Sequence, residues 1–460
     1  MATAALTTDA SRDRGRAPGP RFRTPLGFLS VMRRDPLGFL LDCSRRYGDV
    51  VEIRFPPFRN ILVTGPSGIR HILQDNHRNY WKGLVLGKLK RIAGEGLVFS
   101  DGALWRRQRQ LIQPAFHRER ISALAGMMVD TIAARLDRWQ AHVATEHPFD
   151  VAAEMSHLTL DIVSQALFGA DLGEDKEEFT RAVSAGMAYA NHLLNHFFPL
   201  PLAVPTPANR RGRRAIAGMD RVVWKIIEAR RRDRQDRGDL LAMLINARDA
   251  ETNEAMDDQQ LRDEAVTFLV AGHETTAVAL SWAWHLLSVN PDAERRLHRE
   301  IADVLGTRPP SLRDLGDLRY ARMVLEESMR LYPPAWAAVR EAYHDDEIDG
   351  FRVPAKTVVT LSPYVTHRHP AFWDDPERFD PERFSAERSA GRPDYAYFPF
   401  GGGPRGCVGR QFALMEGQLI LAMVAQRFRL QAVPGHPIEP DPILTLRPRY
   451  GVPMTLHPRN

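Results

Sequence analysis

Cysteine is scarce in this chain, with only Cys43 and Cys407 among 460 residues. A disulfide scaffold is therefore excluded, and a reducing compartment is expected. No apolar run approaches eighteen residues, so no membrane-spanning helix is predicted. Residues 1–23 are rich in Ala, Thr, Arg and Pro and lack the apolar segment of a secretory signal. We expect them to be a disordered leader, and we expect the protein to be cytoplasmic.

The sequence also lacks internal repeats and low-complexity linkers, so residues 24–460 are predicted to form a single domain. An apolar fraction of 44% is enough for a large core in a globular protein. Apolar spacing and proline positions predict a mainly α protein with small β-sheets, of the α+β class. Helices are expected over 35–47, 257–290 and 410–428, over much of 66–250 and up to 332. Strands are expected at 50–55 and 60–64, as a hairpin around Pro56-Pro57, and at 339–360, with a turn at Asp349-Gly350. A further strand is expected at 443–456.

No charge of one sign dominates, because 62 basic residues stand against 57 acidic ones. Arginine clusters occur at 106–109, 210–214 and 230–237, but no zinc, helix-turn-helix or aromatic stacking signature accompanies them. We therefore expect no nucleic-acid partner. Solvated helix faces and a basic patch for an acidic protein remain as the two interpretations. The prolines of segment 197–207 exclude a helix interior, leaving either a mobile apolar loop or a plain linker between helices.

The richest chemical signal is the glycine-dense stretch 397–409, which contains Cys407. Residues 401–406 also satisfy the dinucleotide pattern G-x-G-x-x-G. Pro399 makes the preceding segment a poor central strand, and no strand with a terminal acid follows at the required distance. The dinucleotide interpretation is therefore rejected. A single cysteine in a loop before a helix suits an axial ligand to iron, because backbone N–H groups and a helix N-terminus favour the thiolate.

The full pattern F-x-x-G-x-R-x-C-x-G resembles the haem-binding loop of the cytochrome P-450 family. The resemblance covers residues 36–460 and implies that family's fold, with haem b (iron protoporphyrin IX) between the long central helix and the cysteine-loop helix. Cys407 would ligate the iron, and its thiolate would donate electron density that favours O–O cleavage. The other cofactor-binding residues of this loop would be Phe400, Gly401, Arg405 and Gly409, with Arg405 pairing with a haem propionate.

The middle of the predicted helix 257–290 reads Ala271-Gly272-His273-Glu274-Thr275-Thr276. A glycine there costs about 1 kcal/mol relative to alanine, and the threonine hydroxyls can bond back to the helix backbone. Together with the cysteine loop, this segment resembles the family's oxygen-binding groove. The resemblance implies that Ala271 and Gly272 leave room for dioxygen. Thr275 would donate a hydrogen bond during oxygen activation, and Glu274 would relay protons from solvent.

A third match is Glu327-x-x-Arg330, which resembles the family's E-x-x-R pair. That pair is completed by an arginine from a downstream P-E-R-F sequence, and P-E-R-F occurs here twice. Position relative to Cys407 favours Arg383 over Arg378. The resemblance implies a structural triad that braces the cysteine loop. As an isolated pair, the acid and base would be a surface contact.

Three more residues resemble the family's propionate ligands, namely Trp105 and Arg109 on one helix face and Arg340. By family position, the substrate pocket would include segments 81–94 and 187–200. It would also include the following largely apolar residues: Phe268, Ala271, Ala335, Trp336, Ala337 and Leu444. A lipophilic substrate such as a terpenoid, fatty acid or polyketide is expected.

The resemblance implies a haem-thiolate monooxygenase that hydroxylates or epoxidises its substrate. Only about fifty residues follow Cys407, so electrons from NAD(P)H are expected to arrive through a separate ferredoxin and ferredoxin reductase. Residues 106, 107, 405 and 410 are a candidate docking patch if they share a face, and a monomer is expected. Two alternatives stay open: a peroxide-using or isomerising haem-thiolate enzyme, and a non-catalytic haem sensor. Glu274 and Thr275 argue against the first, because such enzymes often lack this acid–alcohol pair, and a sensor would not need the proton relay or the open groove.

Overall fold

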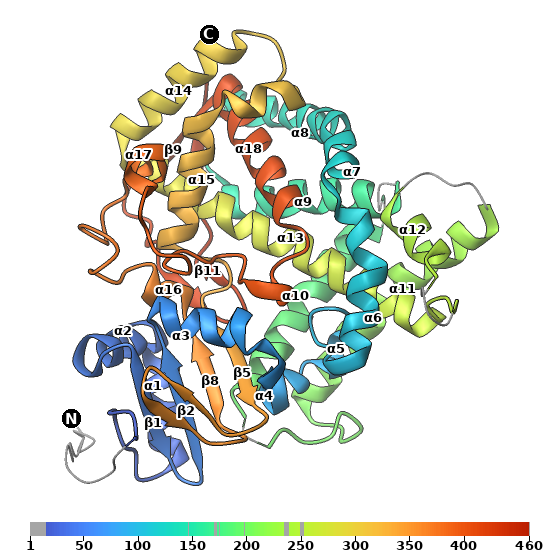
Figure 1. Cartoon of the computed structure of the whole chain (residues 1–460). Coiled ribbons are helices and arrows are strands. Elements are labelled where there is room, and N and C mark those ends of the chain that lie inside the picture. Colours follow the sequence, from blue (N-terminus) through green and yellow to red (C-terminus); the bar gives the residue numbers. More distant parts are fainter. Residues whose placement is uncertain are drawn as a thin grey trace. The chain divides into compact units, whose positions relative to one another are not determined.

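The computed structural model describes residues 15–145, 147–169, 173, 175–196, 198–233, 239–248 and 253–459. The chain divides into two compact units, each built from discontinuous segments (Figure 1). The sheet unit comprises residues 1–88, 330–378 and 389–407, and the helical unit comprises residues 89–329, 379–388 and 408–460. Within the described ranges, no helix is both long enough and apolar enough to cross a membrane.

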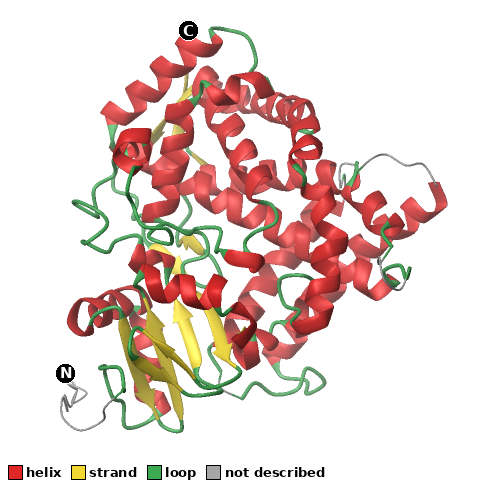
Figure 2. Ribbon diagram, viewed as in Figure 1, coloured by secondary structure: helices red, strands yellow, loops and turns green. Residues whose placement is uncertain are grey.

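The sheet unit is built on a five-stranded sheet of order β1-β2-β8-β5-β3 (Figure 2). Its strands are β1 Val50–Phe55, β2 Phe58–Val63, β3 Tyr80–Trp81, β5 Ala338–Ala342 and β8 Val358–Leu361. The β1–β2 hairpin turns at Pro56-Pro57, as predicted, with Val50 opposite Val63. Strand β2 runs parallel to β8, so the blue N-terminal hairpin of Figure 1 pairs with the orange strands from much later in the chain.

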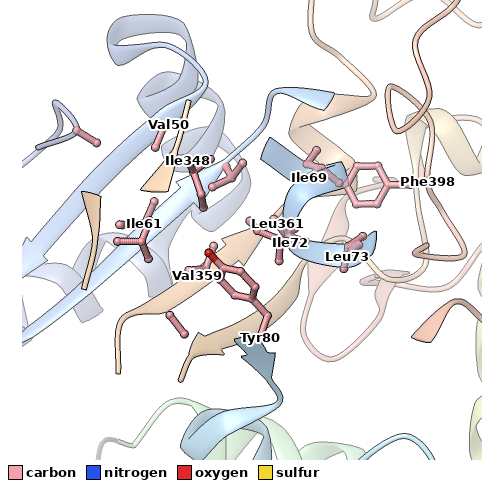
Figure 3. Packing of buried hydrophobic residues seen from close by; sticks show 14 residues of the cluster. Val50, Ile61, Ile69, Ile72, Leu73, Tyr80, Ile348, Val359, Leu361 and Phe398 are labelled. Carbon is pink, nitrogen blue, oxygen red and sulfur yellow. The ribbon is translucent and has the colours of Figure 1, made fainter. Parts of the chain in front are cut away.

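Buried aliphatic side chains from the sheet, the neighbouring helices and the cysteine-loop region form one core (Figure 3). Ile61, Val359 and Leu361 come from the central strands, and Phe398 comes from the segment just before the cysteine loop. Alternate residues of a strand point to one face of a sheet, which gathers these side chains on the same side. The core therefore fixes the start of the cysteine loop to the sheet.

Short elements complete the sheet unit. They are α1 Pro25–Arg34, α2 Pro36–Tyr47, α3 Pro66–Arg70, η1 His71–Asp75, η2 His77–Asn79, α4 Gly83–Gly87, β6 Asp346–Ile348, β7 Phe351–Val353, α16 Pro363–Thr366, α17 Ala386–Ser389 at the unit boundary, and η6 Gly403–Arg405. Strands β6 and β7 form the hairpin expected around Asp349-Gly350.

The predicted leader needs one correction. Residues 1–14 lie outside the described residues, but the next segment runs beside β1. The backbone N–H groups of Glu52 and Arg54 donate to the carbonyls of Pro18 and Pro20, and Phe22 is buried. A disordered leader extending to residue 23 is therefore wrong for residues 17–22. Their hydrogen bonds occupy the edge of β1, which a sheet otherwise leaves unpaired.

The helical unit contains the long helices of the chain (Figure 2). They are α6 Gly102–Ile112, α8 Ala125–Thr145, α9 Val151–Phe168, α10 Asp175–Leu194, α11 Pro207–Asp233, α13 Asp258–Val289, α14 Pro291–Leu305, α15 Arg319–Leu331 (whose last residues belong to the sheet unit) and α18 Arg410–Arg427. Shorter elements are α5 Lys90–Ala93, η3 Gln113–Phe116, α7 Arg118–Ala123, α12 Leu240–Asn246, η4 Leu312–Gly316 and η5 Pro381–Phe384. The mainly α prediction is confirmed.

Two small sheets close this unit. Strands β4 Phe149–Asp150, β12 Pro453–Pro458 and β9 Phe428–Ala432 form one, and β10 Pro440–Pro442 pairs with β11 Leu446–Pro448 in the other. Helix α13 begins where the Asp257 side chain accepts a hydrogen bond from the Gln260 N–H at 2.7 Å, which is an N-cap. Buried Trp282 donates to the Leu446 carbonyl at 2.7 Å, tying α13 to the C-terminal strands.

Candidate functional site

The cysteine loop is closed by its own backbone. The Cys407 N–H donates to the Phe400 carbonyl at 2.9 Å, and the Gly406 N–H donates to the Gly403 carbonyl at 3.0 Å. At the loop entrance, the Phe398 N–H donates to Nε2 of buried His367 at 2.9 Å. These bonds hold the backbone on both sides of the thiol in one conformation.

Two glycines of the loop are required by its close packing within the sheet unit. Gly403 has φ of +60°, and a Cβ there would lie 1.9 Å from the Leu73 carbonyl oxygen of η1. A Cβ on Gly402 would lie 2.2 Å from the Tyr395 ring. Tyr395 in turn donates to the Gln74 side chain at 2.8 Å. At these two positions the close neighbours that require a glycine are therefore protein atoms.

The two cysteines differ sharply in environment. Cys43 is buried in α2, and burial raises the pKa of its thiol to about 12. Cys407 is exposed although its loop is firmly held. A side chain presented at the surface by a rigid loop is available to an external ligand, whereas Cys43 is part of the core.

The middle of α13 is open on one side. The helix is buried over 261–269 and again over most of 276–287, yet Ala271 is exposed, and Gly272, Glu274 and Thr275 are half-buried. The Thr275 hydroxyl donates to the Ala271 carbonyl at 2.8 Å, and the Thr276 hydroxyl donates to the Gly272 carbonyl at 3.3 Å. The expected bonding of both threonines back to the helix is therefore confirmed.

Gly272 lies where α13 crosses α9. A Cβ on Gly272 would come within 2.7 Å of Val163 Cγ2, closer than two carbon atoms can pack. The glycine in the helix interior thus has a packing cause, because its missing side chain lets α9 and α13 approach.

We expect Gly272→Ala to destabilise the protein, because overpacking of about 1–3 kcal/mol exceeds the roughly 1 kcal/mol gained in helix propensity. In a Val163→Ala background, the same change should become stabilising. Urea unfolding of the four proteins in this double-mutant cycle measures the coupling. Additive effects would show that Val163 is not the residue that requires the glycine.

Glu274 is held by a partner far away in the sequence. Its Oε1 accepts from the Thr445 hydroxyl at 3.1 Å, and its Oε2 lies 4.0 Å from Nε2 of His273. Burial lowers the pKa of His273, although the Glu274 charge opposes this shift. His273 is therefore uncharged at neutral pH.

Glu327 and Arg383 meet as predicted from position. Glu327 is fully buried, and its Oε1 lies 3.4 Å from Arg383 Nε and accepts from the Asp380 N–H at 2.8 Å. Arg383 is buried, whereas Arg378 of the other P-E-R-F sequence has an exposed side chain. The two identical motifs are thus distinguished by burial.

Within the sheet unit, buried Arg330 binds several backbone carbonyls. Its guanidinium donates to the carbonyls of His367 at 2.9 Å, Pro376 at 2.7 Å and Arg378 at 3.0 Å. It also lies over the Trp373 ring at 5.1 Å. His367 accepts the hydrogen bond from the Phe398 N–H at the loop entrance. Arg330 therefore supports the cysteine loop indirectly, through His367.

Comparison with known proteins decides the family. Residues 18–454 match the family described as Cytochrome P450. The chain belongs to the cytochrome P-450 family.

Similar proteins include two P-450 relatives from Streptomyces melanosporofaciens. Cyclooctatin synthase is 39% identical over 91% of each chain, and cyclooctat-9-en-7-ol 5-monooxygenase is 38% identical over 92% of this chain and 90% of its own. Pentalenene oxygenase from Streptomyces avermitilis is 34% identical over 94% of each chain. The crystal structure of a cytochrome P-450 haem domain matches with a TM-score of 0.88 and 26% identity, covering 98% of this chain and 99% of the other.

Membership in the P-450 family makes this protein an oxidoreductase of the monooxygenase type, acting on a lipophilic molecule, and implies a haem cofactor. The residues present fit such a group. A thiol is exposed on a braced loop in the sheet unit, and in the helical unit Ala271 is exposed and Gly272 is half-buried in the middle of an otherwise buried helix. Both are surfaces that an apolar ring with a metal centre can use.

The residues expected near the propionates are all on ordered elements. Trp105 and Arg109 are one turn apart on α6 and half-buried, and Arg405 ends η6 and is half-buried. Arg340 on β5 is buried and donates to the Val339 carbonyl at 2.8 Å. Gly409 is the N-cap of α18, which begins three residues after Cys407.

The predicted pocket residues differ in exposure. Phe268 on α13 is buried against Phe116, with ring centroids 5.5 Å apart. Ala335 is exposed, and Trp336, Ala337 and Leu444 are half-buried. Their assignment to a substrate pocket stays a prediction.

Sequence reasoning missed Glu416. It is fully buried in α18, and burial raises its pKa well above the usual range, with the Thr276 hydroxyl opposing the shift. Burial thus favours the neutral acid over the carboxylate. The sequence signal that could have indicated a buried acid was this single carboxyl within the mostly apolar segment 414–425. Thr445, the partner of Glu274, had no such signal.

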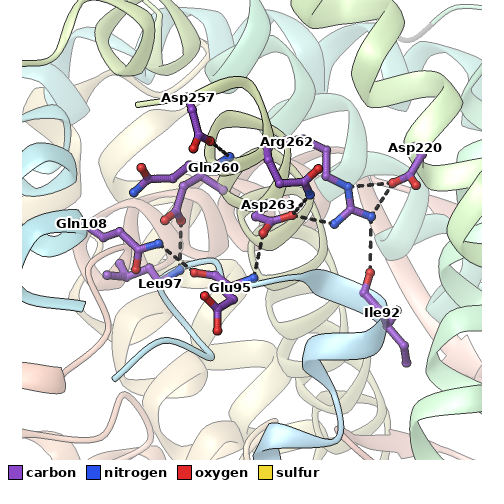
Figure 4. Close-up of polar contacts among 11 residues, drawn as sticks. Ile92, Glu95, Leu97, Gln108, Asp220, Asp257, Gln260, Arg262 and Asp263 are labelled. Atoms are coloured by element: carbon purple, nitrogen blue, oxygen red, sulfur yellow. Dashed lines mark hydrogen bonds and ion pairs between the residues drawn. The ribbon is translucent and has the colours of Figure 1, made fainter. Parts of the chain in front are cut away.

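A second group missed from the sequence lies at the start of α13 (Figure 4). The Asp263 carboxylate accepts from the Glu95 N–H at 2.8 Å. Arg262 is buried and donates to Asp220 on α11 and to Asp263. Glu264 accepts from the Leu97 N–H at 3.0 Å. These acids fix the loop after α5, part of which we predicted to line the pocket.

Burial raises the pKa of Glu264 to about 8, although the Leu97 N–H opposes the shift. Below pH 4.5 both folded and unfolded chains hold the proton. Between about pH 4.5 and 8 the unfolded chain ionises first, so folding becomes less favourable as pH rises. The full difference is about 4–5 kcal/mol.

We therefore expect Glu264→Gln to gain stability relative to the parent across this pH window. Urea unfolding at pH 5, 7 and 9 measures the change. Asp258→Asn, which alters an exposed carboxylate on the same helix, is the control. A parent–variant difference that stays constant with pH would contradict the expectation.

Proposed function

We propose that this protein is a haem-thiolate monooxygenase that hydroxylates or epoxidises a cyclic terpenoid. The exposed thiol of Cys407 on its braced loop is the observation that carries the proposal. Three relatives are named for the cyclic terpenoids cyclooctatin, cyclooctat-9-en-7-ol and pentalenene. These names support the terpenoid class of substrate. Residues 18–454 match one family across both units, which supports a single functional domain over 24–460.

Cys407 would supply the thiolate ligand to the iron, and Arg405, Trp105, Arg109 and Arg340 would hold the propionates. The haem, when bound, supplies the redox chemistry of dioxygen cleavage. Phe400, Gly401 and Gly409 shape the loop on which the thiol stands.

In oxygen activation, the residues of α13 would deliver protons. Glu274 would take a proton from solvent while the Thr445 hydroxyl binds its Oε1. The adjacent His273 is uncharged. The Thr275 hydroxyl now donates to the Ala271 carbonyl. Rotation about χ1 of Thr275 would let the hydroxyl proton point toward dioxygen instead. Exposed Ala271 leaves space beside it.

Electrons would come from NAD(P)H through a separate ferredoxin and ferredoxin reductase in the cytoplasm, with the enzyme acting as a monomer. Arg107 is a weaker candidate for the docking patch than the sequence suggested, because its guanidinium has partners within the protein. Its guanidinium donates to the Ala255 carbonyl at 3.2 Å and lies 3.7 Å from Glu254. Arg106, Arg405 and Arg410 stay candidates for contact with an acidic ferredoxin.

The test is turnover with NADPH, ferredoxin reductase and ferredoxin on cyclic sesquiterpene and diterpene hydrocarbons, with fatty acids as comparison substrates. A monooxygenase gives product that requires donor and dioxygen and that carries one atom from isotopically labelled dioxygen. Product with hydrogen peroxide alone would favour the peroxide-using alternative, and haem binding without product would favour the sensor. A spin-state screen of the same compounds identifies the substrate class independently of the redox partners.

A further inference from the structure

The C-terminal end of α10 carries two histidines that are four residues apart. His192 lies in the last turn of the helix, and His196 follows its last residue, Leu194. Among the sixteen histidines of the sequence, they are the only pair with this spacing. Residues four apart are neighbours on one face of a helix, so the spacing brings the two imidazole rings together.

The helical turn continues through His196 in the structure. The Asn195 N–H donates to the Asn191 carbonyl at 3.0 Å, and His196 Nδ1 lies 2.7 Å from the His192 carbonyl oxygen. The ring centroids of the two histidines are 4.1 Å apart, with the ring planes inclined by 43°. His192 is half-buried and His196 is exposed, so an ion in solution can reach the pair.

The hydrogen bond of His196 selects the nitrogen that could bind a metal. A carbonyl oxygen only accepts, so Nδ1 carries the proton and the lone pair of the neutral ring is on Nε2. Histidines that bind metals almost always donate their other ring N–H in this way, to a carboxylate, a backbone carbonyl or water. The His196 ring therefore has the tautomer and the support of a metal ligand.

His192 is ordered by its neighbours on α10 and α11. Its ring stacks against Tyr189 with centroids 6.1 Å apart, and the Tyr189 hydroxyl donates to the Asn209 side chain at 2.8 Å. Burial lowers the pKa of His192, and the charges of His196 and Arg211 lower it further. The His192 ring is therefore neutral at pH 7, which is the form that binds a metal.

The ring separation and the ligand types indicate the class of ion. Two nitrogens bound to one tetrahedral ion at about 2.0–2.1 Å are about 3.3 Å apart, a separation that small side-chain rotations can reach from these ring positions. Within the described ranges, no three His, Cys, Asp or Glu residues form a metal-binding group, so water would complete the coordination. Imidazole ligands suit Zn²⁺, Ni²⁺ and Cu²⁺, whereas Mg²⁺ and Ca²⁺ prefer oxygen.

We infer that His192 and His196 form a binding site for one transition-metal ion of the class of Zn²⁺, Ni²⁺ and Cu²⁺ at the end of α10. The ion would link the last turn of the helix to the residue beyond it and so stabilise the helix end. This inference goes beyond the proposed reaction. Its test measures metal binding alone, so the result does not depend on turnover.

Isothermal titration calorimetry of the untagged, haem-loaded chain with zinc chloride and with nickel chloride tests the inference, with magnesium chloride for comparison. We expect saturable binding of one zinc or nickel ion per chain at micromolar concentrations and no binding of magnesium. The melting temperature should rise with nickel concentration, because an ion that binds only the folded state stabilises it. Absence of saturable zinc and nickel binding, or equal binding of magnesium, would overturn the inference.

Substitutions of single histidines locate the ion. His192→Gln and His196→Gln should each weaken binding by at least about tenfold, since loss of even an outer partner of a metal ligand costs about 10–100-fold. Matched controls are His117→Gln and His457→Gln, which alter exposed histidines elsewhere and should keep the parent affinity. Thermal melts without metal confirm folding. Parent affinity in both α10 variants, or equal losses in the controls, would place the ion elsewhere and overturn the inference.

Discussion

Replacing Cys407 with alanine is expected to abolish the thiolate-type spectral shift of the reduced carbon-monoxide complex and all monooxygenase turnover. The thiol is exposed on a loop whose backbone is held by the Phe400 and Gly403 carbonyls. The fold should survive, because those backbone hydrogen bonds do not need the Cys407 side chain. The measurement is the carbon-monoxide difference spectrum together with haem content per protein.

Cys43→Ala is the matched control, since Cys43 is the other cysteine of the chain and is buried in α2. It should keep the spectrum and lose only some stability, in the range typical of a small cavity. A normal spectrum in Cys407→Ala, or a lost one in Cys43→Ala, would refute the ligand assignment.

Removing the buried Glu327 is expected to lower the free energy of unfolding by about 3–5 kcal/mol, because it takes away the carboxylate that pairs with buried Arg383. Glu327 has no exposed surface and Arg383 has a side-chain exposure of 5%. Glu327 also accepts from the Asp380 N–H, which would lose its partner. Urea unfolding of Glu327→Ala and of Arg383→Ala measures both halves of the pair.

A glutamate and an arginine nearby in the sequence provide matched controls for Glu327 and Arg383. Glu326→Ala alters the adjacent glutamate, which forms a partly exposed i,i+4 pair with Arg322, and should cost about 0.5 kcal/mol or less. Arg378→Ala alters the exposed arginine of the first P-E-R-F sequence and should cost as little. Similar losses for Arg378 and Arg383 would mean that burial does not distinguish the two motifs.

Local patterns were enough to predict most elements. Proline and glycine act on the backbone of their own neighbourhood, so Pro36, Pro291 and Asp349-Gly350 were reliable markers of element ends. Helix α13 was expected over 257–290 and spans Asp258–Val289. The cysteine loop was recognisable for the same reason, since its residue types follow one another in the chain.

The sequence by itself determined the family and the reaction class, and it singled out Cys407 as the predicted ligand to iron. Tertiary structure decided what depends on distant neighbours. Val163 explains Gly272, Thr445 holds Glu274, and burial separates Arg383 from Arg378. These partners lie more than fifty residues away from the positions they affect, except for the two arginines, whose identical local sequences carry no distinction. Burial and long-range contact arise only when the chain packs, and no short pattern encodes them.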